Sequence, residues 1–150
     1  MSTVKWGTIE SLQSLLTTEL NSLANSTSEI TGKILSAEID NEAGLYPYIT
    51  FELVADFGGN PAAGGYVGLW ILKEIDGTNF EDGSTTVDPA RTEDVYIPLR
   101  TNLSTVQRVT IVNIVIPPYG FKVLLRNKSG QAMDASGNTL KYRRHYEQIA

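Results

Sequence analysis

Hydrophobic and polar residues alternate along most of this chain, and the alternation predicts a protein built from strands. The clearest example covers residues 48–57, where hydrophobic side chains fill every second position and Thr50, Glu52 and Asp56 lie between them. A period of two is typical of a strand with one buried face. Further strands are predicted at residues 33–39, 66–75, 95–99, 106–116, 121–126 and 139–146.

The N-terminal segment follows a different period. In residues 8–23, leucine and isoleucine recur at spacings of three and four, which would place them on one side of a helix. Thr8 suits the N-cap, and the polar run at 25–28 would end the helix. The apolar stripe of this predicted helix consists of Ile9, Leu12, Leu15, Leu16, Leu20 and Leu23.

Seven or eight strands without helices between them predict a mainly β protein, an antiparallel β-sandwich or jelly roll with an N-terminal amphipathic helix. Residues 1–30 would form a helical arm and residues 31–150 the β-sandwich domain. The polar stretch at 76–94 is long for a connection, and loops of that length are usually functional or disordered.

Composition narrows the class of protein. A chain of 150 residues with 41% hydrophobic residues can bury a single core without disulfides, and the absence of cysteine excludes thiol catalysis and thiolate metal sites. The N-terminus has no apolar leader region and no stretch reaches the length of a membrane span, so no membrane contact is expected. The net charge of −5 argues against direct nucleic-acid binding.

Charge is divided along the chain. Residues 1–99 hold fifteen of the seventeen acidic groups and four of the twelve basic ones, about −11, while residues 100–150 carry about +6. Such a division predicts complementary surfaces, within one fold or between copies. The acidic loop at 76–94 and the basic last strand at 141–144 are the patches expected at contacts between subunits.

No catalytic constellation is present. The chain has a single histidine, His145, and no serine in a G-x-S-x-G turn, so nucleophilic catalysis and zinc binding lack their residues. Glu52 and Asp56 share one face of a strand, but four residues span about 13 Å, more than the roughly 5–10 Å of a glycosidase pair. We therefore expect no enzymatic activity and no cofactor.

Some binding possibilities stay open. The acids of residues 76–94 are suitable calcium ligands, although their spacing does not match an EF-hand loop. The basic and aromatic run at 141–146 favours a protein contact over a nucleic-acid site. Trp70 lies in the most apolar strand and is favoured as a core residue. Aromatic residues able to stack on a sugar ring are Tyr48, Tyr66, Trp70 and Tyr119.

Three stretches of the sequence resemble virion structural proteins of tailed bacteriophages: WGTIESLQSLLTTELNSLAN, YITFELVADF and IPPYGFKVLLRNKSGQAMDASGNTLKYRRHYEQ. The resemblance covers much of the chain. It implies a β-sandwich module that associates with itself or docks on a capsid or tail lattice, without enzymatic activity. It also implies a place in the virion after assembly in the host cytoplasm.

The sequence thus leads to one main hypothesis and one alternative. The chain decorates or cements a phage capsid as a homo-oligomer, with the major capsid protein or tail proteins as partners. The alternative is a binding module of a tail or appendage that recognises a host glycan. The interface residues are expected from the apolar stripe and the basic last strand: Leu12, Leu15, Leu16, Leu20, Lys141, Arg143 and Arg144.

Overall fold

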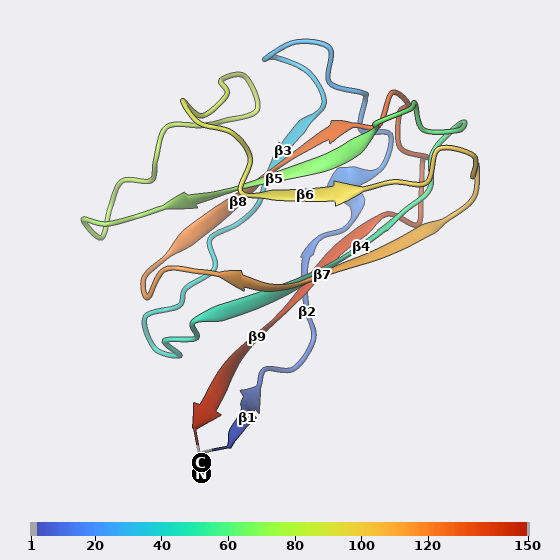
Figure 1. Cartoon of the computed structure of the whole chain (residues 1–150). Coiled ribbons are helices and arrows are strands. Elements are labelled where there is room, and N and C mark those ends of the chain that lie inside the picture. Colours follow the sequence, from blue (N-terminus) through green and yellow to red (C-terminus); the bar gives the residue numbers. More distant parts are fainter. Residues whose placement is uncertain (1–2, 150) are drawn as a thin grey trace.

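The computed structural model describes residues 3–149, which form two antiparallel sheets packed face to face (Figure 1). Sheet A has five strands: β1, β9, β4 and β7 follow in that order, and β2 also pairs with β9. Sheet B has four strands in the order β3, β8, β5, β6. The strands are β1 (Val4–Ile9), β2 (Gln13–Leu16), β3 (Lys33–Leu35), β4 (Tyr48–Ala55), β5 (Tyr66–Lys73), β6 (Val95–Pro98), β7 (Gln107–Val115), β8 (Phe121–Lys128) and β9 (Thr139–Ile149).

One hydrophobic core fills the space between the sheets. In β4, the alternating residues Ile49, Phe51 and Leu53 point inward and are at most 1% exposed. Leu69 of β5 and Val123 of β8 enter the same core from sheet B. The period of two in residues 48–57 therefore has the predicted cause, and the predicted mainly β antiparallel sandwich is confirmed.

Most strand boundaries agree with the sequence pattern, with one shortened element. The strand predicted at residues 33–39 ends at Leu35 as β3, and Ile39 then forms an isolated bridge with Phe121. Ser36 lies between them, and its hydroxyl accepts a hydrogen bond from the backbone N–H of Val123 at 2.9 Å. Where β3 ends, the Ser36 hydroxyl thus accepts the hydrogen bond of a β8 backbone N–H.

The N-terminal amphipathic helix predicted for residues 8–23 is wrong. The segment forms β1, β2 and one 3-10 turn at Thr18–Leu20 (η1), and β1 and β2 both pair with β9 on the edge opposite β4. That edge supplies backbone hydrogen bonds, and such tertiary pairing outweighs a weak helix propensity. Across residues 3–149, no helix is long and apolar enough to cross a membrane.

Beyond the sandwich, β1 and the end of β9 extend as a ribbon that carries both ends of the described chain (Figure 1). Trp6 pairs with Glu147 in this ribbon. Gly7 allows the two strands to approach closely, because a Cβ at this position would lie 2.8 Å from the Cβ of Tyr146. The ribbon thereby holds Trp6 beside β9.

Candidate functional site

The outer face of sheet B is covered by the chain itself. β5 directs Trp70 and Leu72 to this face, where they pack with Leu124 of β8. The loop between β5 and β6, residues 74–94, folds across this cluster, and we call it the covering loop. Its Arg91 carbonyl accepts a hydrogen bond from Trp70 Nε1 at 2.9 Å. Trp70 is only 2% exposed and is unavailable to an external ligand.

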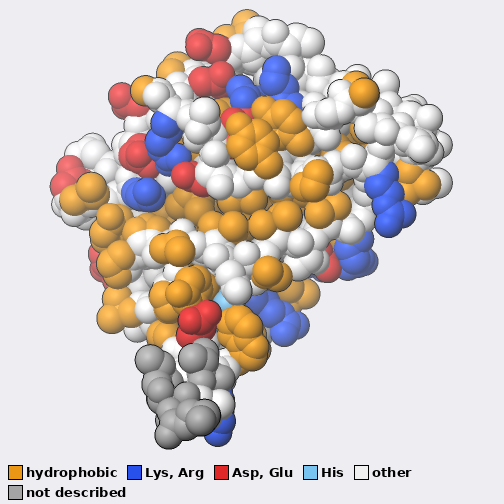
Figure 2. Space-filling view, viewed as in Figure 1, with side chains coloured by type: hydrophobic (Ala, Val, Ile, Leu, Met, Phe, Trp, Pro, Cys, Tyr) orange, Lys and Arg blue, Asp and Glu red, His pale blue; other side chains and the backbone are white. Residues whose placement is uncertain are grey.

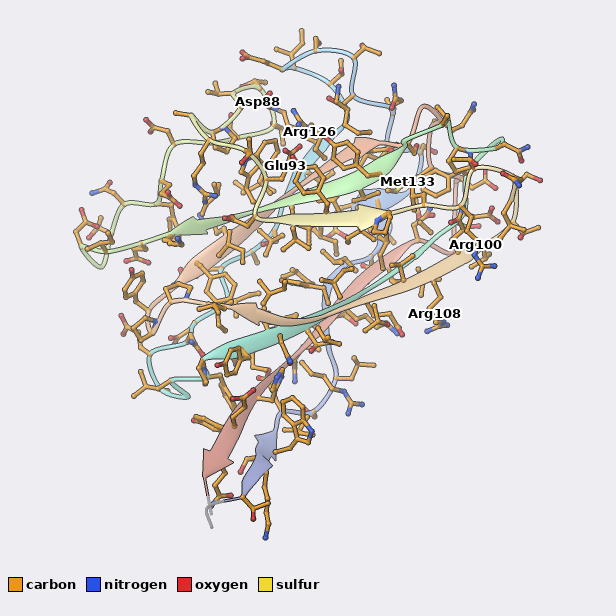
Figure 3. The ribbon with its side chains drawn as sticks, viewed as in Figure 1. Asp88, Glu93, Arg100, Arg108, Arg126 and Met133 are labelled. Atoms are coloured by element: carbon orange, nitrogen blue, oxygen red, sulfur yellow. The ribbon has the colours of Figure 1, made fainter. Side chains whose placement is uncertain are left out.

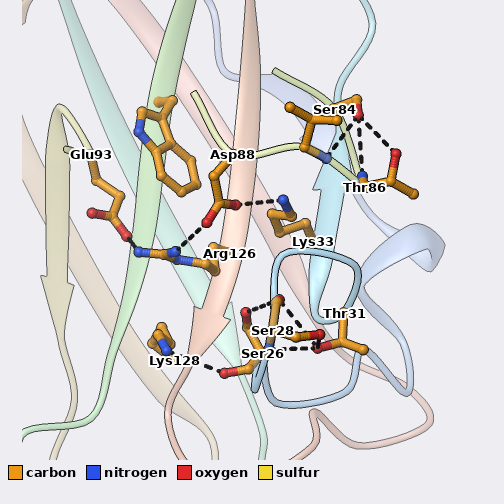
Figure 4. A network of polar contacts seen from close by, with 12 residues as sticks. Ser26, Ser28, Thr31, Lys33, Ser84, Thr86, Asp88, Glu93, Arg126 and Lys128 are labelled. Carbon is orange, nitrogen blue, oxygen red and sulfur yellow. Dashed lines mark hydrogen bonds and ion pairs between the residues drawn. The ribbon is translucent and has the colours of Figure 1, made fainter. Parts of the chain in front are cut away.

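Arg126 of β8 fastens the covering loop by charge (Figure 4). Its guanidinium lies 4.7 Å from the ring centroid of Trp70 and pairs with Glu93 and with Asp88. Asp88 also pairs with Lys33 of β3 at 2.5 Å. The side chains of Arg126 and Glu93 are 15% and 3% exposed, and charges so deeply placed are tolerated only when paired.

Glu93 stays ionised in this position. Burial tends to raise the pKa of its carboxyl, but hydrogen bonds from its own backbone and from Tyr96, together with the charge of Arg126, hold the pKa below its ordinary value of 4.5. Elsewhere in the covering loop, Arg91 pairs with Glu81 at 3.0 Å and with Asp94 at 2.6 Å. Much of the acidic charge expected at a contact between subunits is therefore balanced within the molecule.

The outer face of sheet A has no comparable cover within the described chain, and we call it the open face. Two adjoining hollows of about 350 and 280 Å³ cross it and share Thr50 and Arg143, so they form one shallow depression. In Figure 2, hydrophobic side chains lie beside Lys and Arg side chains where β1 and β9 run. The lining residues are Trp6, Ile9, Leu12, Thr50, Glu52, Thr110, Val112, Asn113, Lys141, Tyr142, Arg143 and His145.

Trp6 is the most prominent aromatic residue of the open face. Its side chain is 60% exposed, and the Trp6 and His145 rings form a T-shaped pair with centroids 5.3 Å apart. His145 stacks on Tyr48 and contacts Asn113 Oδ1 through Nε2 at 3.0 Å. Because His145 is only 6% exposed, it supports Trp6 from beneath. Asn113 has a left-handed backbone with φ of 59°, a conformation that asparagine tolerates better than most residues.

Aliphatic side chains extend the apolar area around Trp6. Ile9 and Leu12 are 55% and 46% exposed, and Val112 and Val115 of β7 are 59% and 72% exposed. Exposed apolar residues that cluster in this way mark interaction sites more often than residues scattered singly. The open face is therefore the strongest candidate for a functional surface.

Basic residues from β9 complete the open face. Lys141 and Arg143 alternate with inward-facing residues, and neither forms an ion pair within residues 3–149. Arg108 of β7 differs because it pairs with Glu52 at 2.8 Å, and it points away from the sandwich in Figure 3. The open face thus offers two uncompensated cations among apolar side chains, which suits an acidic partner.

The leucines predicted at an interface divide between core and surface. Leu16 and Leu20 are 2% and 0% exposed, so they complete the core of the chain itself and do not reach a partner. Leu15 is partly buried against the same core. Leu12 lies in the second hollow of the open face.

The basic residues predicted at that interface divide as well. Lys141 and Arg143 lie on the open face, but Arg144 points to the other side of β9. There Arg144 binds Glu10 twice, Nη2 to Oε1 at 2.6 Å and Nε to Oε2 at 2.9 Å. Its role in the structure is to fasten the segment after β1.

Sequence reasoning missed Trp6, Ile9 and Val112 as surface residues. The predicted helix gave Ile9 a period that its segment does not have, while Trp6 lies before residues 8–23 and its position depends on the pairing of β1 with β9. A signal for Val112 existed: residues 106–116 are apolar at both odd and even positions, yet only one side of β7 can face the core.

The open face presents apolar, aromatic and basic side chains. His145 is enclosed between two rings, and Glu52 is paired with Arg108, so neither is placed as an acid or base for an external substrate. Among residues 3–149, no three His, Cys, Asp or Glu side chains gather in a way that could hold a metal ion. Of the aromatic residues predicted as sugar platforms, Trp70 is buried, and Tyr48, Tyr66 and Tyr119 are partly buried.

Comparison with known proteins finds matches among solved structures. No family model matches the chain, and no curated protein matches it. Among solved structures, a carbohydrate-binding module, Xyl-CBM35 in complex with a disaccharide that contains glucuronic acid, is 13% identical, with a TM-score of 0.41 over 92% of this chain and 87% of the other. The CBM35 from Cellvibrio japonicus Abf62 is 13% identical, with a TM-score of 0.40 over 97% and 98%. Similarities of this size carry no conclusion about a ligand or partner of this chain.

Proposed function

We propose that this chain is a non-catalytic assembly protein of a phage virion, and that it docks on a protein surface through the open face. The observation that carries the proposal is the contrast between the two sheets: the chain covers sheet B with its own loop and leaves an apolar and basic surface on sheet A. The virion setting comes from the resemblance of its sequence to phage structural proteins.

The composition of the open face supports a protein partner. Its exposed aliphatic residues, Ile9, Leu12 and Val112, offer nonpolar area without the ring faces on which sugars stack. Aromatic residues and arginine, here Trp6 and Arg143, are the types enriched in the centres of protein interfaces. A rim of threonine and lysine side chains completes the usual arrangement of an apolar centre with a polar border.

The proposal is tested by co-sedimentation with phage particles that lack this chain. Purified protein is mixed with heads, and separately with tails, made from a phage genome without the gene. We expect the wild-type chain to sediment with one of these particles and Val112→Glu to lose at least tenfold in affinity, because a charge would enter the apolar centre. Sedimentation with neither particle would contradict the proposal.

A matched control is available on the covering loop. Val87 is 51% exposed, close to the 59% of Val112, but it lies on the other side of the molecule. Val87→Glu adds the same charge at the same residue type and should bind particles like the wild type. If both variants lose binding equally, the effect is one of total charge rather than of the open face.

Glycan recognition is a second candidate, and one observation favours it. The exposed Trp6 ring borders a hollow that also contains the Thr50 hydroxyl, the Asn113 amide and the Arg143 guanidinium. Such an arrangement could stack on a sugar ring and hydrogen-bond to its hydroxyl groups.

A glycan array, followed by titration of tryptophan fluorescence, distinguishes the two candidates. A sugar over Trp6 would be lost with Trp6→Ala and retained with Leu12→Glu, because Leu12 lines the other hollow. A protein partner that covers the whole open face would be lost with both variants. An array without binding would remove the glycan candidate.

A further inference from the structure

A second surface of the molecule carries the opposite charge. Five acidic residues lie on two connections of the chain, the segment that follows β3 and the first residues after β5, and we call this group the acidic end. The carboxylates of Glu38 and Glu74 both lie against the open side of Gly120. The acidic end consists of Glu38, Asp40, Glu42, Glu74 and Asp76.

Within the described residues, the acidic end forms no ion pair, and Lys122 is the basic residue whose charge acts on Glu74. Among residues 3–149, no Lys, Arg or His nitrogen lies within 4.0 Å of these five carboxylates. Glu74 is only 8% exposed, and burial together with repulsion from Glu38, Glu42 and Asp76 raises the pKa of its carboxyl, with Lys122 opposing the rise. A group of acids that repel one another gains from an external cation.

Apolar side chains accompany these acids. Ile75, between Glu74 and Asp76, is 82% exposed, and Leu45 on the neighbouring turn is 56% exposed. Figure 2 shows hydrophobic and acidic side chains next to each other at the left end of the molecule. The acidic end therefore has the same construction as the open face, apolar residues with a charged border, but with the opposite sign.

We infer that the open face binds the acidic end of a second copy of this chain. Lys141 and Arg143 would meet the carboxylates of the partner copy, and Trp6 and Leu12 would cover its exposed Ile75. This inference rests on the proposed function, since it names one protein partner of the open face. Complementary charge on both sides of an apolar contact favours this pairing over the alignment of two identical faces.

The contact would be heterologous, because the two surfaces lie on different elements of the chain. A pair of copies then keeps one unused open face on one copy and one unused acidic end on the other. Such contacts close into a ring when the rotation between copies allows it and otherwise continue as an open array. A heterologous contact is therefore suited to a protein that covers an extended lattice.

Charge exchange in analytical ultracentrifugation tests the inference with the full chain. Lys141→Glu/Arg143→Glu reverses the two basic charges of the open face, and Glu42→Lys/Asp76→Lys reverses two of the five charges of the acidic end. We expect the wild type to associate reversibly and each double variant alone to associate at least tenfold more weakly, since like charges then meet. An equimolar mixture of the two variants should associate again, because opposite charges are restored across the contact.

Two controls keep the result interpretable. Arg100→Glu/Lys128→Glu changes the total charge as much as the open-face variant but leaves both surfaces intact, and it should associate like the wild type. Thermal unfolding of every variant checks that the fold is retained.

A wild type that stays monomeric at about 100 μM, or a variant mixture that fails to associate, overturns the inference. Co-sedimentation with phage particles is measured separately. If particle binding persists in that case, the proposed function stands without this self-contact.

Discussion

The two tryptophans of this chain have opposite environments although both point outward from a sheet. Trp70 on sheet B lies beneath the covering loop, with Arg126 over its ring and its indole N–H bonded to the chain. Trp6 on sheet A is 60% exposed and is supported only from beneath, by His145. The difference shows that the chain covers one face with a long loop and several ion pairs and leaves the other face exposed.

The largest effect should come from truncating each tryptophan in turn. Trp70→Ala leaves a cavity under the covering loop and should lower the free energy of unfolding by about 3–5 kcal/mol. Trp6→Ala removes a side chain that is already largely in water and should change it by less than about 0.5 kcal/mol. Urea denaturation of both variants measures the contrast, and equal losses would show that the open face also contributes to folding.

A second, slightly smaller effect should come from the charges that hold the covering loop. Arg126→Met leaves Glu93 buried without its cation and should lower the free energy of unfolding by about 3–4 kcal/mol. Arg126→Met combined with Glu93→Gln removes both charges and should recover most of that loss, because no ion then remains unpaired. Denaturation of the single and double variants tests this, and additive losses would mean that the two residues act independently.

Acid should weaken the covered face through Glu93. The folded state holds the pKa of this carboxyl below 4.5, so its contribution to stability is complete above that value and is lost as the pH falls below it. The double variant Arg126→Met/Glu93→Gln should therefore show a shallower loss of stability between about pH 5 and 3. Denaturation midpoints across this range give the comparison, and identical pH profiles would exclude Glu93 as a source.

The smallest effect should come from the acidic end. The pKa of Glu74 is raised in the folded state, so its ionised form disfavours folding at neutral pH and the penalty disappears as the pH falls. Glu74→Gln should stabilise the chain slightly at pH 7 and not at low pH. Thermal unfolding at both pH values measures the difference, and a destabilised variant at pH 7 would point to a bound cation that Glu74 holds.

The sandwich could be predicted from the sequence because hydrophobic residues alternate along its strands and mark the side that is buried. Ile49, Phe51 and Leu53 recur with a period of two, and their burial confirms the strand directly. The N-terminal segment could not be predicted in the same way. Its leucines reach the core from a short strand, a 3-10 turn and a loop, and this irregular path imitates helical spacing.

Only part of the candidate site could be predicted from the sequence. Lys141 and Arg143 could be identified because basic residues are concentrated near the end of the chain. Trp6 could not, because its exposure depends on the pairing of β1 with β9, a contact between the two ends of the sequence. The sequence predicts a subunit contact for residues 76–94. The pairing of this loop with Arg126 could not be predicted, because Glu93 and Arg126 lie 33 positions apart in the chain.

The ribbon of β1 and β9 also has a mechanical consequence. Residues 4 and 149 are register partners at its tip, so a force applied between them would pull across the strands rather than along them. Under such a load, the backbone hydrogen bonds break one after another instead of together. The ribbon would peel open from the tip past Trp6, and the paired Arg144 and Glu10 would be the first firm stop before the sandwich.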